Sequence, residues 1–378
     1  MQAVILAAGK GTRIYPMGLK KPKPLIEVAN KPVLEHNLDQ MVGFIDEAII
    51  IVGYKKDMIM NHLGDNYRGI KMTYVVQEEQ LGTGHAVLLA EKHVHGKFLV
   101  LNGDDLFSKK DMVSISQCNN CLLVQYKDDP SAFGSVVIKN NFVQDVVEKS
   151  DTFVSHYVNT GMYCFMPDVF QVLHTIPLSA RGEYELTDAV KELAKQGRMH
   201  AEEVTGHWIP VGYPWHILEA SEALLNENEE ISIRGSLGEN VTISGSLDVG
   251  EGSTVGEGVV LRGNIVIGKN CSIGKNVIVT GFTALGNNTI VEDGAHLHNV
   301  IIGAGATLKE ECVVKDSVLG EGSVLSKGVR IANISKDATV KVKSNGKIYD
   351  SGKEKLGAFV GDECVVDDEL DGGDCIGD

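Results

Sequence analysis

The chain has 378 residues, more than one hydrophobic core usually serves, so we expect at least two domains. Its formal net charge of −16 argues against nucleic acid as a partner, because an acidic surface repels a phosphate backbone. No apolar run approaches the roughly 20 residues that span a bilayer, so we expect a cytoplasmic protein that does not bind membranes.

The first predicted domain covers residues 1–228, where short apolar runs alternate with amphipathic stretches. This alternation is typical of strands and helices arranged around a mainly parallel sheet. Predicted strands cover residues 3–6, 48–52 and 98–101. A helix is expected after Pro32, with apolar residues at helical spacing as far as Ile45, and a second over residues 84–93.

The first predicted strand leads into the segment Leu6-Ala-Ala-Gly-Lys-Gly-Thr-Arg13. Its small residues leave backbone N–H groups accessible, so a phosphate chain can approach them closely. The segment is neither a Walker A loop nor a dinucleotide fingerprint, and a plain glycine turn with solvated basic side chains is the alternative. The charged residues up to Ile26 are all basic: Lys10, Arg13, Lys20, Lys21 and Lys23.

The third predicted strand is followed by Asn102-Gly-Asp-Asp105. Open α/β sheets bind ligands beyond the carboxyl ends of their strands, where an aspartate is suited to hold Mg²⁺ together with phosphate oxygens. The alternative is an ordinary turn, which an Asp-Asp pair also favours.

The second predicted domain covers residues 229–361 and has a six-residue repeat of aliphatic residues. Such a repeat predicts a solenoid with three short faces per coil, about five coils in all, with glycine or asparagine at the corners. The repeated residues, with a one-residue slip before Ile302 and another before Leu319, are Ile243, Val249, Val255, Leu261, Ile267, Ile273, Val279, Leu285, Val291, Leu297, Ile302, Leu308, Val314, Leu319, Leu325 and Ile331.

The acidic tail over residues 362–378 contains eight Asp or Glu residues and no Lys or Arg. Stretches with this charge bias bury little apolar surface. The composition therefore predicts a disordered or loosely ordered tail.

The segment from Leu6 to Arg13, with Pro22-Lys-Pro-Leu25, resembles the N-terminal motif of the sugar-phosphate nucleotidylyltransferases, the family of glucose-1-phosphate thymidylyltransferase and UDP-sugar pyrophosphorylases. Later segments resemble that family in the correct order over about 220 residues. The resemblance implies a Rossmann-like α/β nucleotidyltransferase domain followed by a left-handed parallel β-helix. The later segments are Gln77 with Leu81-Gly-Thr-Gly84, Asn102-Gly-Asp-Asp105, Phe133-Gly-Ser135 with Val147-Glu-Lys149, and Asn159-Thr-Gly161.

The resemblance also implies a role for each matched residue. Arg13 and Lys23 would be catalytic, and Asp104 would bind Mg²⁺. The sugar phosphate would meet Gly134, Glu148, Lys149 and Asn159, and the nucleotide would meet Leu6, Ala8, Gly9, Gly11, Gln77, Gly82 and Thr83.

The implied reaction joins UTP or dTTP to glucose 1-phosphate or N-acetylglucosamine 1-phosphate and releases pyrophosphate. The sugar-phosphate oxygen attacks the α-phosphorus in line. Catalysis then needs positioning and charge neutralisation, and no protein nucleophile.

The chain departs from the family pattern at one position. The family usually shows W-x-D-x-G, with the aspartate as second metal ligand, but this chain reads Trp208-Ile-Pro-Val-Gly212. Three interpretations stay open: the metal is held by Asp104, phosphates and water, or Asp105 compensates for Pro210, or the activity is reduced.

The overall plan is similar to archaeal and bacterial enzymes that pair a uridylyltransferase with a glucosamine-1-phosphate acetyltransferase, a reaction helped by a histidine base. His296 and His298 flank the inward Leu297 and should point outward, but Glu310 stands where the family would place its histidine. We therefore expect the β-helix to serve a homo-oligomer, a trimer or higher. The alternatives are a bifunctional enzyme and a non-catalytic nucleotide-sugar sensor, the latter favoured only by Pro210.

Overall fold

The computed structural model describes residues 1–148, 152–227, 230–334 and 338–377. The chain forms two compact units. The first unit contains Met1–Lys10, Pro22–Pro24 and Val33–Pro210, and the second contains Gly11–Lys21, Leu25–Pro32 and Val211–Asp378. The second unit gains helix α7 (Trp215–Asn226) because this helix packs along strands of the solenoid.

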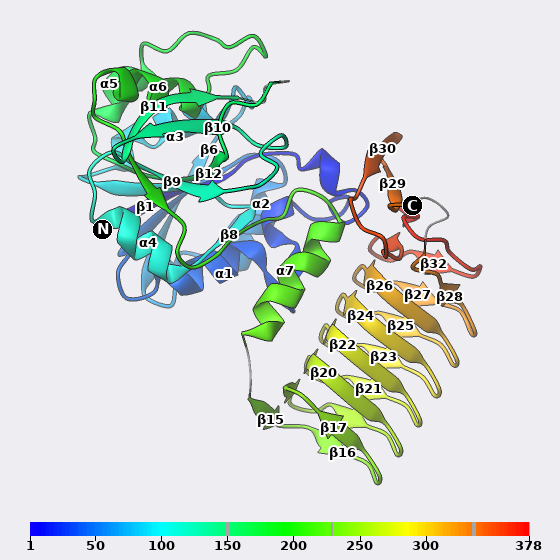
Figure 1. Ribbon diagram of the computed structural model, residues 1–378. Coiled ribbons are helices and arrows are strands. Elements are labelled where there is room, and N and C mark those ends of the chain that lie inside the picture. The colour runs from blue at the N-terminus through cyan, green and yellow to red at the C-terminus, as the bar shows by residue number, and fades with distance from the viewer. Residues whose placement is uncertain (149–151, 228–229, 335–337, 378) are drawn as a thin grey trace. The chain divides into compact units, whose positions relative to one another are not determined.

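A ten-stranded mixed sheet forms the centre of the first unit, in the order β10-β11-β13-β9-β12-β7-β1-β4-β6-β5 (Figure 1). Strand β1 pairs in parallel with β4 and β7, and β4 with β6, as the alternating pattern predicts. The strands are β1 (Gln2–Ala7), β4 (Glu47–Val52), β5 (Asn66–Tyr67), β6 (Ile70–Val76), β7 (Phe98–Asn102), β9 (Cys121–Tyr126), β10 (Ser135–Lys139), β11 (Phe142–Val147), β12 (Tyr157–Phe165) and β13 (His200–Glu203).

The first predicted helix ends earlier than its apolar spacing suggests. Helix α1 stops at Met41, before Gly43, whose φ of +90° lies outside the helical region. The second predicted helix is divided into α3 and a short 3-10 turn, η3 (Glu91–His93). None of the helices in the described ranges has the length and apolar character needed to cross a bilayer. The helices of this unit are α1 (Val33–Met41), α2 (Lys56–Leu63), α3 (Thr83–Leu89), α4 (Lys109–Ser116), α5 (Val169–Leu173) and α6 (Leu186–Lys195).

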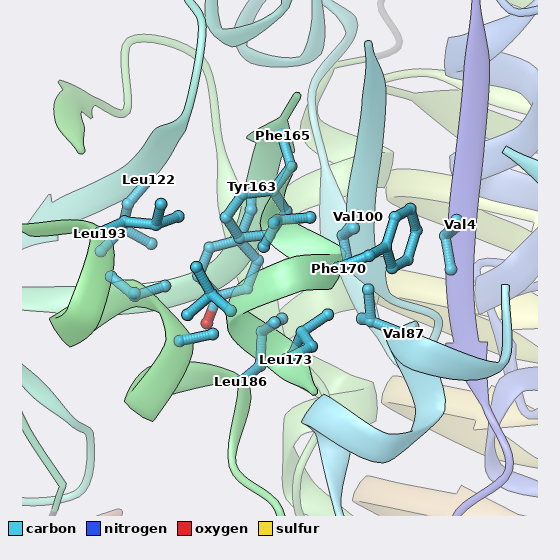
Figure 2. Close-up of a cluster of buried hydrophobic side chains, with 14 of the residues drawn as sticks. Val4, Val87, Val100, Leu122, Tyr163, Phe165, Phe170, Leu173, Leu186 and Leu193 are labelled. Atoms are coloured by element: carbon cyan, nitrogen blue, oxygen red, sulfur yellow. The ribbon is translucent and has the colours of Figure 1, made fainter. Parts of the chain in front are cut away.

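Apolar side chains fix α3, α5 and α6 against the sheet. Figure 2 shows Phe170 of α5 and Val87 of α3 packed near Val4 and Val100 of the sheet. Phe170 also stacks on Phe98, with ring centroids 5.5 Å apart. Full burial of such a side chain contributes about 1.5–3 kcal/mol. This packing holds the helices against β1 and β7.

The second unit is a parallel β-helix, which confirms the solenoid predicted from the repeat. Every predicted inward residue from Val249 to Ile331 is buried, and Ile243 is partly buried. Figure 1 shows the strands stacked as successive rungs. One sheet contains β15 (Ile231–Ile233), β17 (Thr242–Ser244), β18 (Leu247–Val249), β20 (Val260–Ile267), β22 (Ile278–Leu285), β24 (His296–Ile302), β26 (Val313–Leu319), β28 (Arg330–Ile331), β31 (Phe359–Val360) and β33 (Cys375–Ile376). The other contains β16 (Ser236–Leu237), β19 (Thr254–Val255), β21 (Ser272–Ile273), β23 (Ile290–Val291), β25 (Thr307–Leu308), β27 (Val324–Leu325) and β32 (Val365–Val366).

The prediction of a loosely ordered acidic tail is wrong. Strand β32 pairs in parallel with β27, and β33 pairs with β31, so the described tail residues continue the solenoid. Val366 is buried and Ile376 packs against the core, whereas most of the acidic residues lie outside it. Only a few inward positions per coil must be apolar, so the acidic composition does not prevent folding. A hairpin of β29 (Lys341–Ser344) and β30 (Lys347–Asp350) interrupts the coils before β31.

Candidate active site

The predicted nucleotide loop lies where parallel strands of the first unit end. Ala8 follows β1 and Gly103 follows β7, and the N–H of Gly103 donates to the carbonyl of Leu6 at 2.9 Å. Gly53 follows β4, and a Cβ at this position would lie 2.9 Å from the carbonyl oxygen of Ala8. These strand ends are therefore closely joined, as expected for a ligand site at the carboxyl edge of a parallel sheet.

Two predicted residues, Lys23 and Asp104, meet at this edge. The Nζ of Lys23 lies 2.5 Å from Oδ2 of Asp104. The Lys23 side chain is only 9% exposed, whereas that of Asp104 is 35% exposed. The pair thus combines a fixed ammonium group with an accessible carboxylate. Solvent can reach this carboxylate, and so can a metal ion together with phosphate.

Asp105 is held differently from its neighbour. Its carboxylate is buried and accepts long hydrogen bonds from Nε1 of Trp208, at 3.4 Å, and Nδ2 of Asn102, at 3.5 Å. Burial, together with the charge of Asp104, raises the pKa of Asp105 to about 7. The carboxyl of Asp105 is therefore enclosed by protein groups, whereas that of Asp104 is partly exposed.

Pro210 lies directly opposite Asp105. The two residues are register partners in a small antiparallel sheet formed by β8 (Asp105–Phe107) and β14 (Trp208–Pro210). In the part of the chain that the structure describes, no group of three His, Cys, Asp or Glu residues could hold a metal ion. Of these two neighbouring aspartates, Asp104 is the one with the partly exposed carboxylate.

The predicted base-binding residues form one hydrogen-bonded unit after β6. Gln77 is buried, and its Nε2 donates to the carbonyl of Gly82 at 3.1 Å and lies 3.0 Å from Nδ1 of His85. Gly82 has a φ of +104°, and a Cβ there would lie 2.5 Å from the carbonyl oxygen of Tyr184. Thr83 begins α3 and accepts a hydrogen bond from a backbone N–H. This local network fixes the amide of Gln77.

Three of the predicted sugar-phosphate residues also lie together. The N–H of Asn159 donates to the carbonyl of Gly134 at 2.8 Å, and a Cβ at Gly134 would lie 3.6 Å from Oε1 of Glu148. The Oδ1 of Asn159 accepts from the N–H of Gly161 at 2.9 Å. Lys149, the fourth residue of this group, lies outside the described residues.

Arg181 was not predicted from the sequence. Its Nη2 lies 4.0 Å from Oε2 of Glu148, and its Nε donates to Oε1 of the buried Glu185 at 2.9 Å. No motif marks Arg181 in the sequence, because a single arginine in a loop looks like any solvated side chain. Its position places a cation near Glu148 of the predicted sugar-phosphate group.

Arg13 and Gly11 belong to the second unit. The guanidinium of Arg13 lies over the ring of Tyr213, 5.3 Å from its centroid. Gly11 has a φ of +61°, a conformation that glycine adopts without strain. In the same segment, Lys20 and Lys21 form ion pairs with acidic residues of the solenoid.

The chain is similar to known proteins over both of its units. The family described as nucleotidyl transferase matches residues 2–227, and the GMPPB C-terminal domain matches residues 237–332 and 261–371. A bifunctional protein GlmU of Methanococcus maripaludis is 38% identical over 97% of this chain and 88% of its own length. A UTP–glucose-1-phosphate uridylyltransferase, AglF of Haloferax volcanii, is 38% identical over 61% of this chain and 99% of its own. A solved glucose-1-phosphate thymidylyltransferase of Bacillus anthracis has a TM-score of 0.55 and 29% identity, covering 61% of this chain and 97% of that one.

Proposed function

Because this chain belongs to the nucleotidyl transferase family, we propose that it is a sugar-1-phosphate nucleotidylyltransferase. It condenses UTP or dTTP with glucose 1-phosphate or N-acetylglucosamine 1-phosphate to give a nucleotide sugar and pyrophosphate. The observation that carries this proposal is the pairing of Lys23 with Asp104 at the carboxyl edge of the parallel strands. Such an edge, with a cation and an accessible carboxylate, suits a triphosphate.

The reaction requires positioning more than covalent chemistry. An oxygen of the sugar phosphate attacks the α-phosphorus in line, and pyrophosphate leaves. Backbone N–H groups around Ala8 and Gly9 hold the triphosphate, while Lys23 and Arg13 neutralise negative charge on the phosphate oxygens. No protein nucleophile is needed.

Members of this family typically use a divalent metal ion, and we assign Mg²⁺ to Asp104. The accessible carboxylate of Asp104 is a hard oxygen ligand, which suits Mg²⁺, and phosphate oxygens with water complete such sites. When bound, the ion supplies charge neutralisation at the phosphates. The burial of Asp105 and the partial exposure of Asp104 favour the interpretation in which Asp104, phosphates and water suffice.

The sugar 1-phosphate is assigned to the residues around Gly134. Glu148 accepts hydrogen bonds from the hydroxyl groups of the sugar. The backbone N–H of Asn159 donates to the carbonyl of Gly134 and so keeps the loop of Gly134 in place. Arg181 joins this group as a cation near Glu148. The role of Lys149 rests on the family resemblance alone.

The nucleotide base is assigned to Gln77 and Gly82. Uracil and thymine present the same hydrogen-bonding edge, so Gln77 does not distinguish UTP from dTTP. The selectivity between them depends on the space around the 5-methyl group of thymine. The name of the Haloferax volcanii relative supports UTP, and that of the Bacillus anthracis structure supports dTTP.

The proposal is tested by pyrophosphate release from the purified protein with Mg²⁺. UTP and dTTP are each combined with glucose 1-phosphate and with N-acetylglucosamine 1-phosphate. At least one pair should release pyrophosphate, and Asp104→Ala should lower that rate by about 10²-fold or more. Absence of release with all four pairs, despite measurable nucleotide-sugar binding, would instead support a regulatory nucleotide-sugar sensor.

A second candidate function is acetyl transfer from acetyl-CoA to the amine of glucosamine 1-phosphate. A cavity of about 620 Å³ in the second unit is lined by residues that include His298, Asn333 and Lys355. The Nδ1 of His298 lies 2.8 Å from Oγ1 of Thr280, and its Nε2, the candidate base, lies 3.1 Å from Nδ2 of Asn299. Glu310 is not in this cavity, and pairs with Lys327 at 2.8 Å.

The matching assay follows CoA thiol release with glucosamine 1-phosphate as acceptor. The amine attacks the thioester carbon, CoA leaves as the thiol, and the base takes the proton lost by the amine. Activity that His298→Ala abolishes would establish the bifunctional enzyme. Absence of thiol release from a protein that still releases pyrophosphate would exclude it.

We also propose that the β-helix supports a homo-oligomer, a trimer or higher. Ile290 of β23 and Val365 of β32 are 42% and 60% exposed, and both belong to the same sheet of the solenoid. Exposed apolar residues on one face are typical of subunit interfaces. Light scattering in solution should give the mass of three or more chains, and a monomer mass would contradict the proposal.

A further inference from the structure

The loop over residues 11–21 is tied to the last coils of the β-helix. The hydroxyl of Tyr15 donates to the carbonyl of Gly377 at 3.2 Å, and Oγ of Ser344 donates to the carbonyl of Tyr15 at 3.0 Å. Two ion pairs join the same parts of the chain, Lys20 with Glu363 and Lys21 with Glu321. All these residues belong to the second unit.

Lys21 is the central cation of this arrangement. Its side chain is 13% exposed, and its Nζ also lies 3.8 Å from Oδ1 of Asp362, which is 6% exposed. Oδ1 of Asp362 accepts the N–H of Glu321 at 2.9 Å, so the two acidic residues are fixed relative to each other. We call Lys21, Glu321 and Asp362 the loop clasp. The pair of Lys20 and Glu363 is more exposed and is expected to contribute less.

Two members of the clasp, Lys21 and Asp362, are largely buried, whereas the side chain of Glu321 is 45% exposed. Removing one partner of a buried ion pair leaves the other charge without compensation, which is unfavourable. Burial raises the pKa of Asp362, and the charge of Lys21 opposes that rise. The loop is thereby held to one arrangement by charges that are 300 or more residues away in sequence.

The loop matters because of what it carries. It contains Arg13, and it connects Gly9 to Lys23 along the chain. The loop therefore joins two segments of proposed phosphate-binding residues along the chain, and its conformation fixes the backbone that carries Arg13.

We propose that the loop clasp is a positioning device for nucleotidyl transfer. Lys21, held by Glu321 and Asp362 of the β-helix, keeps residues 11–21 in the arrangement in which Arg13 acts on the triphosphate. Lys21 is then a positioning residue and does not itself bind phosphate. This inference rests on the proposed function, and it assigns the β-helix a part in the reaction of the nucleotidyltransferase fold.

The test uses the full chain and three variants of the clasp. Lys21→Glu and Glu321→Lys each place like charges side by side. The double variant Lys21→Glu/Glu321→Lys restores opposite charges at positions 21 and 321 but leaves a glutamate beside Asp362. Each single variant should lower kcat/KM for the nucleotide about 10–100-fold, because a small misplacement of a catalytic group has effects of this size. The double variant should recover part of that loss.

Glu292→Gln is the matched control. It breaks another ion pair on the β-helix, that of Lys309 with Glu292 at 2.8 Å, and should leave kcat/KM unchanged. Asp362→Asn is a milder clasp variant that keeps the shape of the side chain and should give a smaller loss. Thermal unfolding of every variant confirms that it is folded.

Hydrogen exchange over residues 11–21 supplies a readout that is independent of turnover. Exchange should rise in the single variants, fall back part of the way in the double variant and stay unchanged in Glu292→Gln. A wild-type protein without pyrophosphate release would refute the proposed function, whereas unchanged exchange in the single variants would refute the clasp. If Lys21→Glu is inactive and Glu321→Lys is fully active, Lys21 binds phosphate directly and the inference is wrong.

Discussion

The Nζ of Lys23 lies 2.5 Å from Oδ2 of Asp104, although the two residues are 81 positions apart in the sequence. Both are assigned to the same phosphate groups, so their substitutions should not be independent. Lys23→Met and Asp104→Asn should each lower kcat/KM for the nucleotide by about 10²–10³-fold. Steady-state kinetics of the double variant should show a loss well below the product of the two. Fully multiplicative losses would show that the two side chains act at separate sites.

Pro210→Asp should strengthen metal binding. Pro210 is the register partner of Asp105, and an aspartate there would add a carboxylate near the one provided by Asp104. Mg²⁺ is commonly bound by one or two carboxylates plus substrate phosphates. The Mg²⁺ concentration that gives half-maximal pyrophosphate release should fall by about tenfold. Pro210→Ala is the control for loss of the proline ring, and equal behaviour of the two variants would contradict this assignment.

Gly161→Ala should damage the site and the fold together. Gly161 has a φ of +81°, and a Cβ there would overlap Nδ2 of Asn102, which donates to the carboxylate of Asp105. The expected loss of stability is about 2–4 kcal/mol, with at least a tenfold drop in kcat.

Gly197→Ala separates the backbone effect from the overlap. Gly197 also has a positive φ, +67°, but a Cβ there would have no neighbour within 4 Å. It should therefore cost about 1 kcal/mol, measured by urea unfolding, with unchanged activity. Equal losses in the two variants would show that contact with Asn102 is unimportant.

Glu47 should make stability depend on pH in the acidic range. Burial would raise its pKa, but hydrogen bonds from Lys71, Thr73 and Gln2 outweigh burial and lower it to about 2, against 4.5 for an ordinary glutamate. A lowered pKa stabilises the fold above about pH 4.5, and this contribution is lost as the pH falls towards 2.

Glu47→Gln should therefore destabilise the protein at pH 7 by roughly 1–2 kcal/mol. The difference from the wild type should shrink at pH 3, as measured by urea unfolding at both pH values. Glu78→Gln, at an exposed position 3.9 Å from Lys56, should change little at either pH. A difference that persists at pH 3 would mean that Glu47 stabilises the fold by packing alone.

The repeating parts of the fold could be predicted from the sequence, and the reason is the repetition itself. Each coil of the β-helix needs an inward aliphatic residue at the same position. Val249 and Leu297 are two of the residues that meet this requirement, and its recurrence along the chain made the fold recognisable. The strand that ends at Ala7 could be predicted as well, because a short apolar run before a glycine loop has few other interpretations. Asp104 could be placed at the sheet edge for the same reason, since it directly follows a strand.

The contacts between distant parts of the sequence could not be predicted. The pairing of Lys21 with Glu321 joins residues 300 positions apart, and no local pattern indicates it. No sequence motif contains Arg181, and only its distance to Glu148 indicates that it belongs to the proposed sugar-phosphate group. The acidic tail misled the prediction because net charge concealed Val366 and Ile376, which keep the inward pattern of the coils.

The most direct test of nucleotidyl transfer follows the α-phosphorus itself. UTP or dTTP labelled at the α-phosphate is incubated with the purified chain, Mg²⁺ and each sugar 1-phosphate, and the products are separated. The account predicts label in a nucleotide sugar, one pyrophosphate released per product, and dependence on both the sugar 1-phosphate and Asp104. Label that stays in the triphosphate with every sugar 1-phosphate, or that appears in the free monophosphate whether or not sugar 1-phosphate is present, would contradict it.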